Sequence, residues 1–181
     1  MIKMKNKYYK YVESFKDFPK KGIIFWDFTP LLTNPEIFKE AVQDILNHFK
    51  NKKITKVAAI ESKGFTLGTA LAYEMRKPLV LIRKSGLIPS KTISEDFIKE
   101  YGKGRYEIKD KSLNKSDCVL LVYDIMAGSG ATKAAINLIE KQRAKVAGCA
   151  YVIELEYLKG REDLKQYDLY PLVKILEKKL K

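Results

Sequence analysis

Apolar residues recur with helical spacing between residues 35 and 50. They fall in three adjacent pairs and a single residue, separated by two polar positions each time: Ile37, Phe38, Ala41, Val42, Ile45, Leu46 and Phe49. This spacing gathers them on one face of an α-helix. Asn34 is suited to cap such a helix, and a proline in its first turn costs no hydrogen bond. The pattern therefore predicts an amphipathic helix from Pro35 to Lys50.

The next three segments alternate between strand and helix patterns. The run KVAAI (56–60) is too short for a helix and continuously apolar, which is typical of a strand buried on both faces of a parallel sheet. A helix is predicted over 65–75, where every fourth residue is apolar, and the run PLVLI (78–82) predicts a second strand. Together these segments form one βαβ unit.

A second βαβ unit follows later in the chain. The strand CVLLVYD (118–124) leads through the loop IMAGSG to a predicted helix over 131–144 and the strand KVAGCAYVI (145–153). A length of 181 residues suits one domain. The chain is therefore predicted to be a single α/β domain, with a doubly wound, mainly parallel sheet flanked by helices.

Two segments lie outside this alternation. Residues 83–107 contain three glycines, a proline and many charges, so they predict a long, poorly packed loop. Long loops in compact domains are commonly lids or disordered segments. Residues 1–34 precede the first predicted core helix and form a small N-terminal segment.

Charge and composition narrow the classes of protein. The chain has 35 basic and 22 acidic residues, a net charge of +13, which indicates a polyanionic partner: nucleic acid, a membrane surface or a phosphorylated metabolite. The lysines are spread along the whole chain, so no basic arm or recognition helix stands out, and a solvated surface is the simpler explanation of the charge. With 46% apolar and 31% charged residues, the composition is that of a globular protein.

The cysteines and the N-terminus bear on location. Cys118 and Cys149 each lie in an apolar run, where a cysteine usually acts as a small buried hydrophobe. The N-terminus has positive charge but no apolar signal region, and about 18 consecutive apolar residues occur nowhere. A cytoplasmic protein without a membrane partner is expected.

The clearest chemical motif is VYDIMAGSGAT. In open α/β sheets ligands bind beyond the carboxyl ends of strands, which points to the loops after Ile60, Ile82 and Val122. In the last of these a buried strand delivers Asp124, then small residues, then a helix start, so backbone N–H groups and the helix dipole are available to a phosphate. The motif lacks a Walker lysine and the GxGxxG spacing, and a purely structural glycine-rich turn is the alternative.

This motif resembles the binding motif for phosphoribosyl pyrophosphate (PRPP) of type I phosphoribosyltransferases. Five more segments match adenine phosphoribosyltransferases in order and spacing: DFPKKGIIFWDFTPLL, IESKGFTLG, LVLIRKSG, ISEDFIKEYG and ELEYLKGRE. They cover nearly the whole chain. The resemblance implies purine salvage, in which the phosphoribosyl group of PRPP is transferred to adenine, giving AMP and pyrophosphate.

The resemblance also implies binding residues. Asp124 is expected to accept hydrogen bonds from ribose hydroxyls. The residues expected around the 5′-phosphate are Ala127, Gly128, Ser129, Gly130, Ala131 and Thr132. Ser62, Lys63 and Gly64 are expected to hold the pyrophosphate, and the substrate-binding set includes Arg83 and Lys84. Ile24, Phe25 and Trp26 are expected to line the base pocket.

In this picture residues 1–34 form a base-binding hood and residues 83–107 a closing lid. Glu100 and Tyr101 match the family's catalytic lid pair, with Glu100 as general acid or base on the imidazole side of adenine. A solvated lid carboxylate is the alternative for Glu100. Mg²⁺ is expected to bind mainly through PRPP, without protein metal ligands. The family is usually dimeric, and Tyr8, Tyr9 and Tyr11 are expected on an exposed N-terminal helix that helps to cover the partner.

Several site positions depart from the family pattern. Tyr123 replaces the first of two acidic residues, and a phenol does not replace its charge. The other departures are Gly128 and Ala131 for threonines, Ser129 for glycine, Lys63 and Trp26 for arginines, and Leu87 for lysine. A diverged homologue with weak or no activity, or with another base, is therefore an alternative. A purine-responsive nucleic-acid-binding regulator is a third reading, but residues 1–34 are too few for an added DNA-binding domain.

Overall fold

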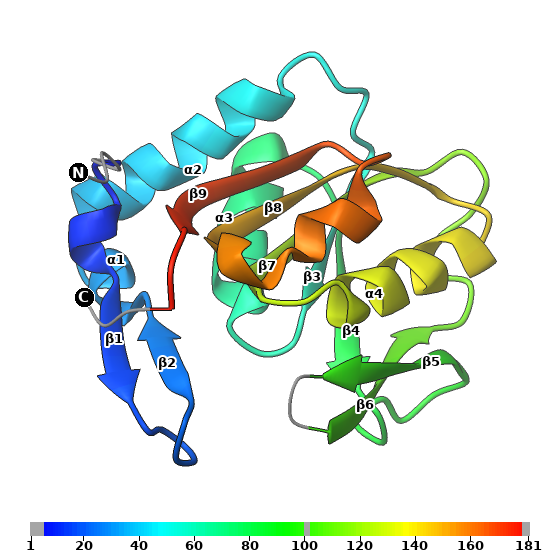
Figure 1. Ribbon diagram of the computed structural model, residues 1–181. Helices are drawn as coiled ribbons and strands as arrows, with labels where there is room; N and C mark the ends of the chain where they lie inside the picture. The colour runs from blue at the N-terminus through cyan, green and yellow to red at the C-terminus, as the bar shows by residue number, and fades with distance from the viewer. Residues whose placement is uncertain (1–5, 100–101, 179–181) are drawn as a thin grey trace.

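A computed structural model describes residues 6–99 and 102–178 of the chain, which build a seven-stranded sheet (Figure 1). In sheet order the strands are β5 (Thr92–Lys99), β6 (Gly102–Lys109), β4 (Leu79–Lys84), β3 (Lys56–Ile60), β7 (Cys118–Met126), β8 (Lys145–Leu155) and β9 (Leu169–Ile175). The five strands from β4 to β9 in this order run parallel. The predicted α/β fold with a mainly parallel sheet is confirmed.

Helices cover both faces of the sheet. They are α2 (Pro35–Phe49) and α3 (Gly64–Met75) on one face, and α4 (Gly130–Lys141) on the other (Figure 1). Successive residues of a strand point to opposite faces. Val57 accordingly belongs to the core under α2 and α3, whereas Ala58 belongs to the core under α4. Because both faces are covered, β3 is apolar along most of its length.

The helices and central strands lie close to their predicted bounds. The Asn34 side chain caps α2 by accepting the backbone N–H of Ile37 at 3.2 Å, and α2 ends one residue before the predicted Lys50. β7 and β8 each extend two residues beyond the predicted end. As a result β7 carries Asp124 within the strand rather than at its last position.

The segment 83–107 is not the irregular loop that its glycines and charges predicted. Most of it belongs to an antiparallel hairpin, β5–β6, which extends the sheet by pairing β6 with β4. The rings of Phe97 and Tyr106 are buried and stack with their centroids 4.3 Å apart. In β6 charged residues alternate with Tyr106 and Ile108, which is the period-two pattern of a strand with one buried face. The glycines concealed that pattern.

The N-terminal segment forms a separate hairpin. It consists of β1 (Glu13–Lys16) and β2 (Ile24–Asp27), followed by the short helix α1 (Thr29–Leu32). Before it lies a 3-10 turn, η1 (Tyr9–Tyr11), in place of the predicted helix. The β1–β2 and β5–β6 hairpins project from the same end of the molecule, at the bottom of Figure 1.

The predicted exposure of the N-terminal tyrosines is wrong for Tyr8. Its side chain is buried, and its hydroxyl donates to Asp44 Oδ2 on α2 at 2.5 Å. Tyr9 and Tyr11 are half-buried and pack against the same core. This segment therefore anchors the hairpin to α2. No helix in the described ranges is long and apolar enough to cross a membrane.

Candidate active site

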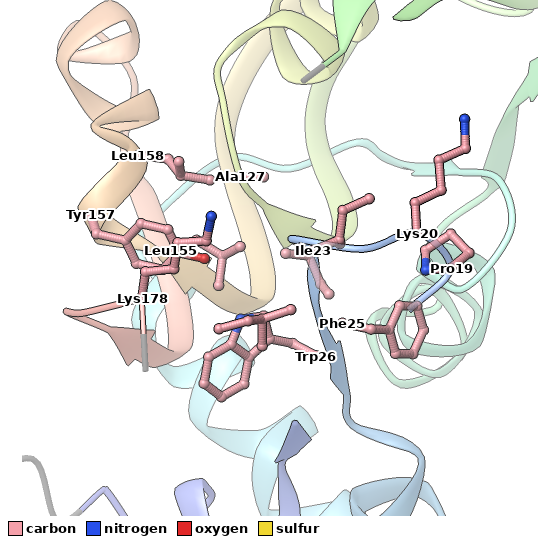
Figure 2. A pocket seen from close by; sticks show the side chains of 12 residues that line it. Pro19, Lys20, Ile23, Phe25, Trp26, Ala127, Leu155, Tyr157, Leu158 and Lys178 are labelled. Carbon is pink, nitrogen blue, oxygen red and sulfur yellow. The ribbon is translucent and has the colours of Figure 1, made fainter. Parts of the chain in front are cut away.

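A cavity of about 460 Å³ lies where the β1–β2 hairpin faces the ends of β7 and β8 (Figure 2). The carboxyl ends of parallel strands are where α/β sheets bind ligands. Apolar side chains make up most of its wall, including Ile24, Phe25, Trp26, Ala127, Leu155 and Tyr157. The structure thus brings the three predicted base-pocket residues together with the first residue of the predicted phosphate turn.

The predicted phosphate turn joins β7 to α4. Gly130 begins the helix, so backbone N–H groups of its first turn lack partners within the helix. Such an end attracts an anion. The two hydroxyl side chains expected to contact the phosphate have other partners: Ser129 Oγ donates to Asp163 Oδ2 at 2.5 Å, and Thr132 is buried and accepts from the Tyr151 hydroxyl at 3.3 Å.

Two glycines hold other elements close against this turn. At Gly130, a Cβ atom would lie 2.4 Å from the carbonyl oxygen of Ile98 on β5. At Gly160, in the 3-10 helix η3 (Gly160–Leu164), a Cβ atom would lie 2.7 Å from the carbonyl oxygen of Ala127. Both distances are too short for any side chain. The backbone of the turn is therefore held by close contacts on two sides.

Asp124 lies on β7, two residues before the last residue of the strand, Met126. The phosphate turn follows directly. Burial raises the pKa of its carboxyl, against the opposing effect of the Ile125 backbone N–H and of the positive charge on Lys63. A carboxylate with few protein donors is an available acceptor for ligand hydroxyls. Binding of ribose hydroxyls by Asp124 stays a prediction.

The predicted pyrophosphate loop, residues 62–64, follows β3 and ends at the first residue of α3. A Cβ atom at Gly64 would lie 3.1 Å from the Val122 carbonyl oxygen, so the loop packs tightly against β7. Lys63 Nζ lies 3.3 Å from Asp27 Oδ1 and 4.5 Å from the ring centroid of Phe25. In this structure the Lys63 ammonium group is therefore directed toward the hood strand β2.

Glu61 organises the neighbouring basic residues, a role that the sequence did not reveal. Its carboxylate accepts from Arg83 Nη2 at 3.1 Å and from the backbone N–H of Lys84 at 2.9 Å. Burial favours the neutral acid, but these two donors outweigh it and hold the pKa of Glu61 below its usual value. The carboxylate thus joins the ends of β3 and β4, where both basic residues lie beside the predicted pyrophosphate loop.

Tyr123 carries no charge into this region. Burial first, and then the Asp124 carboxylate, raise the pKa of its phenol well above the ordinary value, so it stays neutral. Its hydroxyl lies 3.2 Å from that of Tyr106, whose pKa burial raises to about 12. The pair links β7 to the β5–β6 hairpin. Glu100 and Tyr101, the predicted catalytic pair, lie outside the described residues.

Comparison with known proteins identifies the family. The model of the phosphoribosyl transferase domain matches residues 29–176. The adenine phosphoribosyltransferase of Dinoroseobacter shibae is 43% identical over 159 residues, which are 88% of this chain and 89% of that protein. The chain belongs to the adenine phosphoribosyltransferase family.

Solved adenine phosphoribosyltransferases have the same fold. The crystal structure of the enzyme from Thermoanaerobacter pseudethanolicus has a TM-score of 0.89 at 32% identity, covering 93% of this chain and 98% of that one. The enzyme from Saccharomyces cerevisiae, solved with an iminoaltritol bisphosphate and adenine, has a TM-score of 0.84 at 30% identity, covering 92% and 96%. The resemblance drawn from the sequence motifs is confirmed.

In this adenine phosphoribosyltransferase family member, sequence reasoning missed the residues that support the predicted phosphate and pyrophosphate turns. Asp27 holds Lys63, Glu61 holds Arg83, and Asp163 holds Ser129. Each of them lies inside or next to a segment that resembles the family. Their partners are distant in the sequence or in another strand, so only the folded chain identifies what they do.

Proposed function

We propose that the protein transfers the 5-phosphoribosyl group of PRPP to adenine, giving AMP and pyrophosphate in purine salvage. One observation carries the proposal: Ala127 of the phosphate turn also lines the cavity formed by the hood residues Ile24, Phe25 and Trp26. A purine in that cavity and a phosphate at the start of α4 would therefore lie close together, on either side of Ala127. Relatives about 40% identical over most of their length are adenine phosphoribosyltransferases.

The proposed arrangement suits transfer at the anomeric carbon. The base nitrogen forms a bond to that carbon while the bond to pyrophosphate breaks, and positive charge develops on the ribose in between. Asp124 would bind the ribose hydroxyls, while Lys63, Arg83 and Lys84 would stabilise the departing pyrophosphate. The apolar cavity wall would exclude water, which otherwise attacks the same carbon.

We propose that a divalent cation binds here together with the substrate. In the described residues no three His, Cys, Asp or Glu side chains gather into a metal-binding group. Mg²⁺ often takes most of its ligands from phosphate and water. Bound with PRPP, it would reduce the negative charge of the pyrophosphate, with Asp124 as the acidic side chain on the adjoining strand β7.

We further propose that the β5–β6 hairpin acts as the lid of the site. The carbonyl oxygen of Ile98 on β5 lies against Gly130 at the phosphate turn, and Tyr106 on β6 contacts Tyr123 on β7. In the sequence, Glu100 and Tyr101 come between β5 and β6. Glu100 would receive the proton that the base loses as it forms the new bond. Replacing Glu100 with Gln is expected to reduce turnover while leaving adenine binding intact, and undiminished turnover would remove this role.

The proposal includes a cytoplasmic homodimer. The thiols Cys118 and Cys149 are free, which suits a reducing compartment. A groove of about 440 Å³ runs along β4 and is lined mainly by apolar side chains, among them Leu81 and Leu87, which are 40% and 44% exposed. A second copy of the chain would cover them.

Nucleotide synthesis tests the proposed function directly. The protein would be incubated with PRPP, Mg²⁺ and each of adenine, hypoxanthine, guanine and xanthine, and the products separated by chromatography. AMP from adenine is expected. Because Tyr123 is neutral and Lys63 replaces an arginine, a slow rate fits a diverged member of the family, and product from another base would reassign the substrate. Absence of nucleotide with all four bases would contradict enzymatic function.

A further inference from the structure

The cavity contains a buried hydrogen-bond donor without a protein partner. The Trp26 side chain is only 2% exposed, and its Nε1–H has no acceptor among residues 6–99 and 102–178. Buried donors in folded proteins are nearly always paired, because leaving one unpaired costs stability. An unpaired donor at a ligand cavity therefore points to an acceptor on the ligand.

The position of Trp26 places that donor at the base site. Trp26 lies on β2 between Phe25 and Asp27, and its ring lines the cavity with Ile125 and Leu155. Figure 2 shows the ring at the floor of the cavity, with the indole nitrogen, in blue, on the edge turned toward the other lining side chains. Most of these neighbours are apolar, so they offer the N–H no competing acceptor from their side chains.

We propose that Trp26 Nε1–H donates a hydrogen bond to a ring nitrogen of the bound purine and thereby selects the base. The inference rests on the proposed function. Trp26 occupies a position where the family pattern has an arginine, so this contact belongs to this chain. A purine with a bare ring nitrogen facing Trp26 satisfies the donor. A purine with N–H at that edge places two donors against each other and is rejected.

The alternative is that Trp26 is simply a core residue. Its burial among the side chains under α2 and α3 is compatible with that role. The two readings differ in what Nε1 does. A core role needs the ring alone, whereas selection of the base needs the N–H group. The decisive experiment therefore changes the N–H and keeps the ring.

A double-mutant cycle between protein and ligand makes this comparison. Isothermal titration calorimetry, with ribose 5-phosphate present, would compare adenine with three analogues in which N1, N3 or N7 is replaced by C–H. Wild type is expected to bind one analogue about tenfold more weakly than adenine. Trp26→Phe is expected to bind that analogue and adenine equally. If Trp26→Phe instead weakens the binding of adenine and of all three analogues by the same factor, the inference would be overturned.

The sequence offers a closer variant in case Trp26→Phe does not fold. Trp26 is the one tryptophan of the chain, so biosynthetic incorporation of 3-benzothienylalanine changes this position alone, replacing N–H with sulfur in a ring of nearly the same shape. The free protein is expected to gain about 2–4 °C in Tm, because an unpaired buried donor is removed. A lower Tm would mean that Nε1 already has a partner, and would overturn the inference.

The fluorescence of Trp26 separates this inference from the proposed function. Adenine is expected to change the emission of the wild-type protein, since the reporter lies at the base site. If bases bind and react but show no coupling to the indole N–H, the Trp26 inference alone fails. If the wild type binds neither adenine nor any of the three analogues, both the Trp26 inference and the proposed function fail.

Discussion

At the scale of single residues, the two carboxyl groups at the proposed active site have pKa values shifted in opposite directions. Asp124 is partly buried, and burial outweighs its backbone donors and raises its pKa, whereas at Glu61 the donors from Arg83 and Lys84 outweigh burial and lower the pKa. Glu61 is therefore a fixed carboxylate that positions Arg83 and Lys84. Asp124 keeps its acceptor capacity for a ligand, at a cost in stability.

Asp124→Asn tests this difference. Losing hydrogen bonds to a charged acceptor is expected to reduce kcat/KM for PRPP about 10- to 100-fold. Wild-type activity should fall as the pH drops through the raised pKa of Asp124, a decline beginning nearer to neutrality than for an ordinary aspartate. Steady-state kinetics across pH would measure both effects, and the same acidic decline in the variant would contradict the role of Asp124.

The same substitution has a predicted effect on stability. Because the pKa of Asp124 is higher in the folded than in the unfolded chain, ionisation disfavours folding once the pH exceeds the unfolded value. Asp124→Asn is therefore expected to be more stable to urea at neutral pH. The advantage should shrink as the pH falls through the raised pKa of the folded aspartate, and it should be gone below the pKa of the unfolded one. Urea titrations at neutral and acidic pH would show this, and a variant less stable than wild type at pH 7 would contradict it.

Lys63 is expected to act on PRPP rather than on the base, although it lies over the Phe25 ring. Lys63→Ala should raise the KM for PRPP about tenfold while changing the KM for adenine little, since an ionic hydrogen bond to the pyrophosphate is lost. Lys63→Arg is the matched control and should bind at least as well, because its planar group grips phosphate oxygens in pairs. Equal changes in both KM values would assign Lys63 to the hood instead.

At the scale of elements, the phosphate turn depends on a neighbour remote in the sequence. Gly160 begins η3 and allows it to lie against Ala127 and Gly128, where a Cβ atom would approach the turn to 2.7 and 2.9 Å. Because the turn is short, any displacement of its backbone would also move the N–H groups that would face a phosphate. The geometry of the turn is thus shared between two elements.

Gly160→Ala is therefore expected to weaken phosphate binding indirectly, through the turn, because residue 160 itself is not expected to contact the phosphate. A displacement of the turn should reduce affinity for ribose 5-phosphate about tenfold, equivalent to about 1.4 kcal/mol, measured by calorimetry. Glu162→Ala, an exposed change in the same 3-10 helix, serves as the control and should bind normally. Unchanged affinity in Gly160→Ala would show that the turn does not depend on η3.

At the scale of the whole molecule, the two hairpins project from one end and flank the carboxyl ends of the parallel strands (Figure 1). One contributes Ile24, Phe25 and Trp26 to the cavity, and the other contacts the phosphate turn at Gly130. The sheet between them supplies Asp124 and the pyrophosphate loop. The proposed substrate sites therefore draw on segments from the whole length of the chain.

The proposed dimer makes a prediction at this scale. Leu81→Lys places a charge in the apolar groove along β4 and is expected to convert a dimer to a monomer, measured by light scattering, with the circular dichroism spectrum retained. Phe15→Lys is the control, because Phe15 is similarly exposed but lies on β1. A dimer that persists in Leu81→Lys would place the interface elsewhere.

The sequence by itself determined the alternation of strands and helices, the parallel sheet, and the turn after Asp124. Local signals sufficed for these, because periodicity, a capping asparagine and small residues act over a few positions. The same signals gave a wrong prediction of an irregular loop for residues 83–107, where glycines and charges concealed a strand pattern. They also gave a wrong prediction of exposure for Tyr8, whose partner Asp44 lies on α2.

Only the tertiary structure decided which groups meet. It directed Lys63 to Asp27, engaged Ser129 with Asp163, buried Thr132, and left the indole N–H of Trp26 unpaired at the cavity among the described residues. The partners of Lys63 and Ser129 lie more than 30 residues away along the chain. Hydrogen bonding and burial depend on distances in space, and residue order does not specify those until the chain has folded.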